Sequence, residues 1–207
     1  MVVIGEYPIT ATQTTQKQLL SRVSTQSVVS YDEVIKTEQK RMIENCAVSD
    51  IDFEFVLDSS GSIGSHDWKV AVDSIAKYWI RDTIKPNGSP QCGNHIAIRR
   101  YSSDHFYDLD FNPTNDWMKN GFTDYTSYVF DIFENLPFQG RGTDTAGALE
   151  KVRIEDIHKA RAGTKYVMVF TDGASQNFHD TVEQAQLLHP LVSDVFAYGI
   201  GSGRDPM

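Results

Sequence analysis

The hydrophobic residues of this chain gather in short apolar runs that alternate with segments of helical spacing. Four of these runs have the composition of strands, and they lie at residues 53–57, 96–101, 166–170 and 195–200. The first run is continuous except for Glu54, as expected for a central strand that is covered on both faces. Residues 106–111 alternate after a polar turn at 102–104, which predicts a hairpin partner for the second strand.

Helical spacing predicts helices between these strands. They begin near Ser65, span 122–136, begin at 143–145 and run from His179 to His189. Ser65 is a candidate N-cap for the first helix, whose Trp68 and Trp79 we expect to pack against a sheet. Strands that alternate with helices predict an α/β fold with a mostly parallel sheet and right-handed crossovers.

The start of the chain has a different composition from the rest. Residues 1–30 are rich in Thr, Gln and Ser, and residues 31–45 carry only a weak amphipathic pattern. We therefore predict that residues 1–49 form an N-terminal extension or linker, and that residues 50–207 form the folded domain. With 40% hydrophobic residues among 207, the chain can build one good core.

The charge balance restricts the class of partner. The net charge is -9, from 19 basic and 28 acidic residues, and no basic run occurs. Nucleic acids and anionic membranes both need clustered Lys and Arg, so we expect neither as a partner. No apolar stretch approaches the length of a membrane span, so we expect no membrane insertion.

An acidic, hydroxyl-rich turn follows the first predicted strand. Asp58, Ser60 and Ser62 occupy alternating positions, so one loop can direct three oxygen atoms towards one point. Oxygen ligands of this kind suit a hard divalent cation, and Mg²⁺ above all. Asp and Ser are also favoured helix caps, so this loop alone leaves both interpretations open.

Two further loops favour the metal interpretation. Thr143 follows Gly142 just before a predicted helix, and Asp172 follows the strand at 166–170. In a parallel sheet, ligand sites form beyond the carboxyl ends of the strands, where these loops would meet. We therefore predict one metal site that is formed by two acids and three hydroxyls, namely Asp58, Ser60, Ser62, Thr143 and Asp172.

This set of residues resembles the metal-ion-dependent adhesion site of the von Willebrand factor type A domain, the integrin I-like fold. The resemblance covers about residues 50–203 and includes the runs 135–138, 140–145 and 170–173. It implies a Rossmann-like, doubly wound α/β domain with helices on both faces and one antiparallel edge strand, here 106–111. The family continues past Gly203 with a helix and a last strand, so we expect this domain to lack them or to receive them from another segment.

The resemblance also implies what the site does. Bound Mg²⁺, with Mn²⁺ or Ca²⁺ as alternatives, would be completed by a Glu or Asp of a protein ligand, and collagen or another matrix protein leads the candidates. The expected setting is extracellular, in a secreted or matrix protein. Arg141 stands where the family often has glycine, either as a rim contact for an acidic ligand or as an exposed loop charge.

Two other classes of function are alternatives to adhesion. The family also occurs in chelatase-associated and repair complexes, so an intracellular assembly module is the alternative to adhesion. The sequence has neither a Gly-x-Ser-x-Gly motif nor a His-Glu-x-x-His motif, and its six histidines are scattered. We therefore predict that the protein is not an enzyme.

The two cysteines, Cys46 and Cys92, each precede a predicted strand by a few residues. If the strands at 53–57 and 96–101 are parallel neighbours, both cysteines lie at the sheet edge opposite the metal, within reach of a disulfide. We expect the protein to gain the mass of two hydrogens on reduction, measured by intact-mass spectrometry. Two free thiols before reduction would contradict the pairing, whereas a disulfide would support an extracellular setting.

Overall fold

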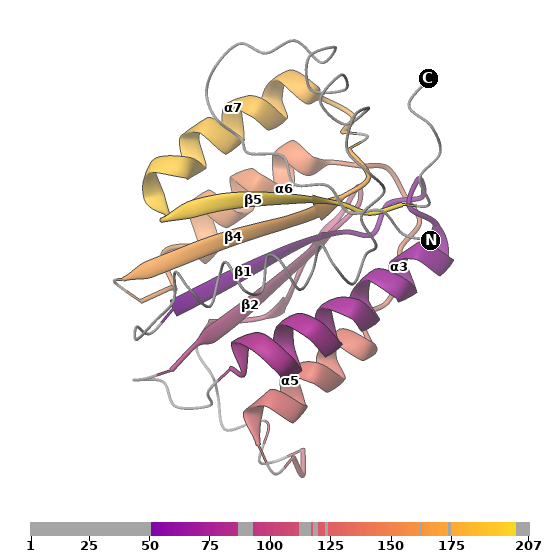
Figure 1. Cartoon of the computed structure of the whole chain (residues 1–207). Helices are drawn as coiled ribbons and strands as arrows, with labels where there is room; N and C mark the ends of the chain where they lie inside the picture. Colours follow the sequence, from indigo (N-terminus) through magenta and orange to yellow (C-terminus); the bar gives the residue numbers. More distant parts are fainter. Residues whose placement is uncertain are drawn as a thin grey trace, which may run out of the picture.

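A sheet of five strands forms the centre of the fold (Figure 1). The computed structural model describes residues 51–86, 93–111, 117, 120–122, 124–161, 163–173 and 175–201. In chain order the strands are β1 (Ile51–Asp58), β2 (His95–Tyr101), β3 (His105–Leu109), β4 (Thr164–Thr171) and β5 (Asp194–Gly199). Across the sheet the order is β3-β2-β1-β4-β5, with β3 antiparallel to β2 and the other pairs parallel. The prediction of a mostly parallel sheet with one antiparallel edge strand is confirmed.

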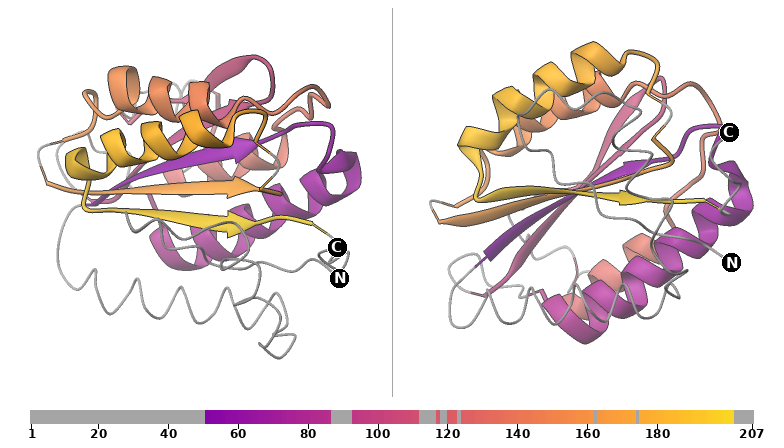
Figure 2. Two further views of the ribbon diagram at one scale, coloured as in Figure 1. Left: turned by 90° about the horizontal axis from the view of Figure 1, so that it is seen from above. Right: turned by 45° about the horizontal axis from the view of Figure 1, so that its top comes forward.

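Helices cover both faces of this sheet (Figures 1 and 2). One face packs against α3 (Gly64–Ser74), its π-helical continuation η1 (Ile75–Ile84) and α5 (Tyr125–Glu134). The other packs against α6 (Thr145–Lys151), its π-helical continuation η2 (Val152–Asp156) and α7 (Phe178–Leu188), which leads into the short η3 (His189–Leu191). None of the helices in the described part of the chain is both long and apolar enough to cross a membrane.

The central strand β1 is buried along its whole length. Phe53, Phe55 and Leu57 belong to the core beneath α3 and α5, whereas Val56 belongs to the core beneath α6 and α7. Successive side chains of a strand point to opposite faces, so a strand with helices on both sides needs apolar residues at nearly every position. The predicted packing of Trp68 is also confirmed, because it is 3% exposed and lies in the first of these cores.

The N-terminus of α3 corrects one prediction. Ser65 does not cap α3, because the helix begins at Gly64 and its cap position, Ile63, makes no side-chain capping bond. Gly64 has φ of +77°, a conformation that glycine adopts at little cost, so backbone freedom rather than a hydroxyl starts this helix. Three other helices do have side-chain caps, from Asp124, Asp144 and Asn177.

The edge strand β3 is short and carries charge. The carboxylate of Asp108 accepts two hydrogen bonds of 3.0 Å from the Arg100 guanidinium on β2. The same guanidinium lies 4.6 Å from the ring centre of Phe106, which is 38% exposed. The exposed aromatic ring of this strand is therefore partly covered by a cation.

Several predictions fall outside the described residues. They are the N-terminal extension at 1–49, the helical pattern at 31–45, and the cysteines Cys46 and Cys92. The parallel pairing that the disulfide hypothesis assumes is present, since Phe53 of β1 lies opposite Ile96 of β2. The disulfide itself stays a prediction.

Phe55 offers a test of this core. Its ring is fully buried, edge-on to Phe133 at 5.4 Å and stacked on Phe170 at 6.0 Å. We expect Phe55→Ala to lower the free energy of unfolding by about 3–5 kcal/mol, because it leaves a cavity beside the central strand. Phe178→Ala, at a residue that is 55% exposed, should change it by only about 0.5 kcal/mol. Urea denaturation measures both, and equal losses would contradict the packing described here.

Candidate functional site

The carboxyl end of β1 presents a buried carboxylate. Asp58 is 0% exposed, and its Oδ1 accepts a hydrogen bond of 2.9 Å from the backbone N–H of Ser60. Its Oδ2 accepts a bond of 2.8 Å from the hydroxyl of Thr171, at the end of β4. These two bonds fix the carboxylate at the junction of the two parallel strands.

The loop after β1 also brings two hydroxyl groups together. The Oγ atoms of Ser60 and Ser62 are 3.0 Å apart, although Ser60 is buried and Ser62 is exposed. Ser59 turns the other way, and its hydroxyl and backbone N–H both donate to the carbonyl of Tyr101. The alternation seen in the sequence therefore places Ser60 and Ser62 beside one another and leaves Ser59 to anchor the loop to β2.

The segment that carries Thr143 lies against this first loop. The N–H of Gly61 donates to the carbonyl of Arg141 at 2.7 Å, and the N–H of Gly140 donates to the carbonyl of Ser59 at 2.9 Å. A Cβ atom on Gly61 would lie 3.0 Å from the Gly140 carbonyl oxygen, so a glycine here permits the close approach. Thr143 is 6% exposed.

The loop after β4 completes the arrangement. Asp172 follows β4 directly, and the N–H of Gln176 further along this loop donates to the carbonyl of Thr143 at 3.0 Å. The structure therefore brings the loops of all five predicted ligands to one sheet edge.

The electrostatics of this edge favour a cation. Burial raises the pKa of Asp58, the hydrogen bonds from Ser60 and Thr171 lower it, and the negative charge of Asp172 raises it again. Two acids that disfavour each other's charge would both be stabilised by a positive ion between them. Carboxylate and hydroxyl oxygens are also the ligand types that a hard divalent cation takes. The residues present fit such an ion.

Sequence reasoning missed the residues that support this edge. Thr171 holds Asp58, and the strand register could have revealed it, because Phe170 lies opposite Leu57 and thus Thr171 is level with Asp58. The pattern at 102–104 predicts only a turn, yet this loop after β2 contacts the 141–144 segment. The carbonyl of Ser102 accepts from the N–H of Asp144 at 2.9 Å. Because β2 is parallel to β1, its loop had to emerge at the same edge.

Arg141 lies at the rim of this arrangement. Its guanidinium forms an ion pair with the carboxylate of Asp104, and both side chains are more than half exposed. The N–H of the next residue, Gly142, donates a hydrogen bond of 3.1 Å to the hydroxyl oxygen of Ser103. The rim charge is therefore tied to the loop after β2.

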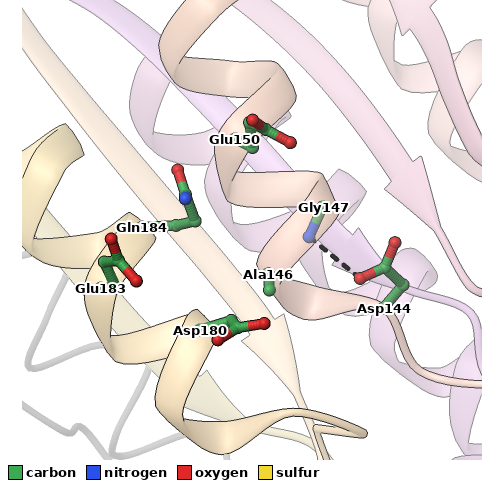
Figure 3. A pocket seen from close by; sticks show the side chains of 7 residues that line it. All are labelled: Asp144, Ala146, Gly147, Glu150, Asp180, Glu183 and Gln184. Carbon is green, nitrogen blue, oxygen red and sulfur yellow. Dashed lines mark hydrogen bonds between the residues drawn. The ribbon is translucent and has the colours of Figure 1, made fainter.

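An acidic groove lies between α6 and α7 (Figure 3). It has a volume of about 430 Å³, and its acids are Asp144, Glu150, Asp180 and Glu183. Two of them serve the helix starts: Asp144 accepts from the N–H of Gly147, and Asp180 lies in the first turn of α7. Asp144 adjoins Thr143, so the groove extends the negative charge of the sheet edge that carries Asp58 and Asp172.

Comparison with known proteins identifies the class to which this fold belongs. Residues 52–206 match the family model of the von Willebrand factor type A domain. The chain therefore belongs to that family, and the predicted family is confirmed.

The similar proteins include a collagen chain and a matrix protein. The collagen alpha-1(VI) chain of Gallus gallus is 26% identical over 157 residues, which cover 75% of this chain and 15% of that one. The mussel byssus proximal thread matrix protein 1 matches with a TM-score of 0.59 at 14% identity, over 72% of this chain and 37% of that one. A manganese-loaded TRAP protein of Plasmodium vivax matches with a TM-score of 0.57 at 19% identity, over 76% and 59%. The structural matches support the shared fold, and the chain spans a small part of the collagen relative.

Thr171 provides a test of the site's construction. Thr171→Val removes the hydroxyl that donates to Asp58, so a buried carboxylate loses one of its hydrogen bonds. We expect the free energy of unfolding in chelator to fall by about 1–3 kcal/mol. Thr171→Ser keeps the hydroxyl and should retain most of that stability. If the two variants unfold alike by urea titration, the hydrogen bond does not support Asp58.

Proposed function

We propose that this domain binds a divalent cation at the carboxyl edge of its sheet and uses it to hold an acidic side chain of a protein partner. One observation carries the proposal: a buried carboxylate, Asp58, lies beside a second acid, Asp172, and next to the adjoining hydroxyls of Ser60 and Ser62. Two acids and neighbouring hydroxyls at one sheet edge suit a metal ion better than most other ligands.

Each proposed ligand has a distinct role. Ser60, Ser62 and Thr143 supply neutral oxygens, whereas Asp58 and Asp172 supply negative charge, directly or through water. Neutral ligands leave a cation with more affinity for a further anion than carboxylates would, so a partner's Glu or Asp can complete its octahedron. Mg²⁺ is the proposed ion, with Mn²⁺ or Ca²⁺ as alternatives, and the manganese-loaded TRAP structure supports divalent binding in this fold. No bond is made or broken, so the proposed activity is binding rather than catalysis.

The proposed partner is an extracellular protein, with collagen or another matrix protein first. The collagen VI relative and the mussel matrix protein support this setting. Arg141 is the proposed rim residue. Its guanidinium is exposed and paired with Asp104, so an incoming carboxylate can compete for a charge-assisted bond at the edge of the site.

We expect Asp58→Ala to abolish Mg²⁺-dependent binding to matrix components while leaving the fold largely intact. The measurement is a panel of immobilised matrix proteins, read by interferometry with Mg²⁺ and with chelator, and circular dichroism checks the fold. Asp82→Ala, which removes an exposed acid of η1 that pairs with Arg81, is the matched control and should bind as the wild type does.

Titration of Mg²⁺ into the domain without a partner separates the two halves of the proposal. Heat of binding in the wild type and in Asp82→Ala, but none in Asp58→Ala, would support the metal site whatever the partner is. Partner binding that persists in excess chelator would contradict the mechanism.

A further inference from the structure

Glu54 is an acid in the middle of the central strand, and its side chain is completely buried. Its sheet neighbours are both apolar, Ala97 on β2 and Val167 on β4. Among the residues that the structure describes, neither of its carboxyl oxygens has a hydrogen-bond partner. A carboxylate that is desolvated in this way is strongly disfavoured, and such a group keeps its proton instead.

Several neighbouring segments place charged or titratable groups near this carboxyl. They are Arg99 on β2, Tyr107 on β3, Asp110 after β3, Glu155 and Asp156 on η2, and Lys159 after η2. The set holds two cations against three acids besides Glu54.

Both cations form ion pairs with those other acids. The Arg99 guanidinium donates to both carboxylate oxygens of Asp156, and its Nη2 also donates to Glu155 at 3.3 Å. The Lys159 Nζ lies 3.5 Å from the carboxylate of Asp110 and 4.0 Å from the ring centre of Tyr107. Neither of these two cations forms an ion pair with Glu54 in the described structure.

The balance of burial and neighbouring charges favours the protonated form of Glu54. Burial is the main cause that raises the pKa of Glu54 well above its ordinary value of 4.5, and the negative charges of Asp156 and Asp110 add to it. Arg99 and Lys159 oppose the shift and do not cancel it. The buried hydroxyl of Tyr107 makes no hydrogen bond to Glu54, so it does not stabilise a charge there either.

We propose that Glu54 is a proton-dependent switch of stability: the folded domain holds it protonated, and loss of that proton weakens the packing of η2 against the sheet. The unfolded chain releases this proton near pH 4.5, whereas the folded chain retains it to higher pH. The contribution of Glu54 to stability is therefore full below pH 4.5 and declines as the pH rises towards the folded-state pKa. This proposal is independent of the metal site.

Glu54→Gln tests the switch, because the amide has nearly the same shape and carries no charge at any pH. Urea unfolding is measured from about pH 5 to about pH 8 in chelator, so that metal binding does not contribute to the pH dependence of either protein. The equilibrium constant for unfolding should rise with pH up to about tenfold per unit more steeply in the wild type than in the variant. Glu134→Gln, at an exposed residue near the end of α5, should keep the wild-type slope.

Parallel pH curves for the wild type and Glu54→Gln would overturn the proposal. If Glu54→Gln does not fold, carbon-13 NMR of the wild-type glutamate carboxyl carbons gives the same answer. One carboxyl signal that stays protonated well above pH 4.5 supports the switch, and titration of every glutamate near 4.5 overturns it. Neither result bears on Mg²⁺ binding, so failure here leaves the proposed function untouched.

Discussion

The parallel pairing of β1 with both β2 and β4 is the constraint on which the site depends. Parallel strands that lie side by side end at the same edge, so the loops after β1, β2 and β4 must emerge together. The register sets the details: Asp58 lies opposite Tyr101, and Phe170 lies opposite Leu57. A slip of one residue in the pairing of β1 with β4 would separate Asp58 from the Thr171 hydroxyl.

The loops at that edge are held mainly by backbone hydrogen bonds. Carbonyls of Ser59, Ser102 and Arg141 accept bonds from loops far away in the sequence. Backbone contacts of this kind leave the hydroxyl groups of Ser60 and Ser62 in place without using them as structural donors to the other loops. The hydroxyls of Ser60 and Ser62 are therefore supported by a frame that does not use them, as a binding site needs if it is to be formed before its ligand arrives.

Much of this arrangement could be predicted from the sequence, because it depends on short-range patterns. The apolar run at 53–57 and the alternation of Asp58, Ser60 and Ser62 each carry their own signal, and the parallel sheet edge then brings distant loops together. Features that depend on tertiary contacts could not be predicted. Ser65 has the chemistry of a cap, but Gly64 started the helix through its backbone conformation.

Glu54 is a second feature that depends on tertiary contacts and could be predicted only in part. Its place in an otherwise apolar run correctly indicated burial, yet the sequence could not show that Arg99 and Lys159 would already be paired with other acids. Burial can be predicted from the strand's own sequence pattern. The charge state of a buried acid also depends on which ion pairs the neighbouring residues form in the folded structure.

The charged edge strand β3 has a consequence for how copies of this domain behave at high local concentration. An edge strand with free backbone groups can pair with the same strand of another molecule and begin an aggregate. Here β3 has only five residues, Asp108 and Arg100 form an ion pair at its side, and the guanidinium lies over the ring of Phe106. Short length, fixed charge and a covered ring all oppose such pairing, so this edge of the sheet favours separate copies of the domain over strand-to-strand association.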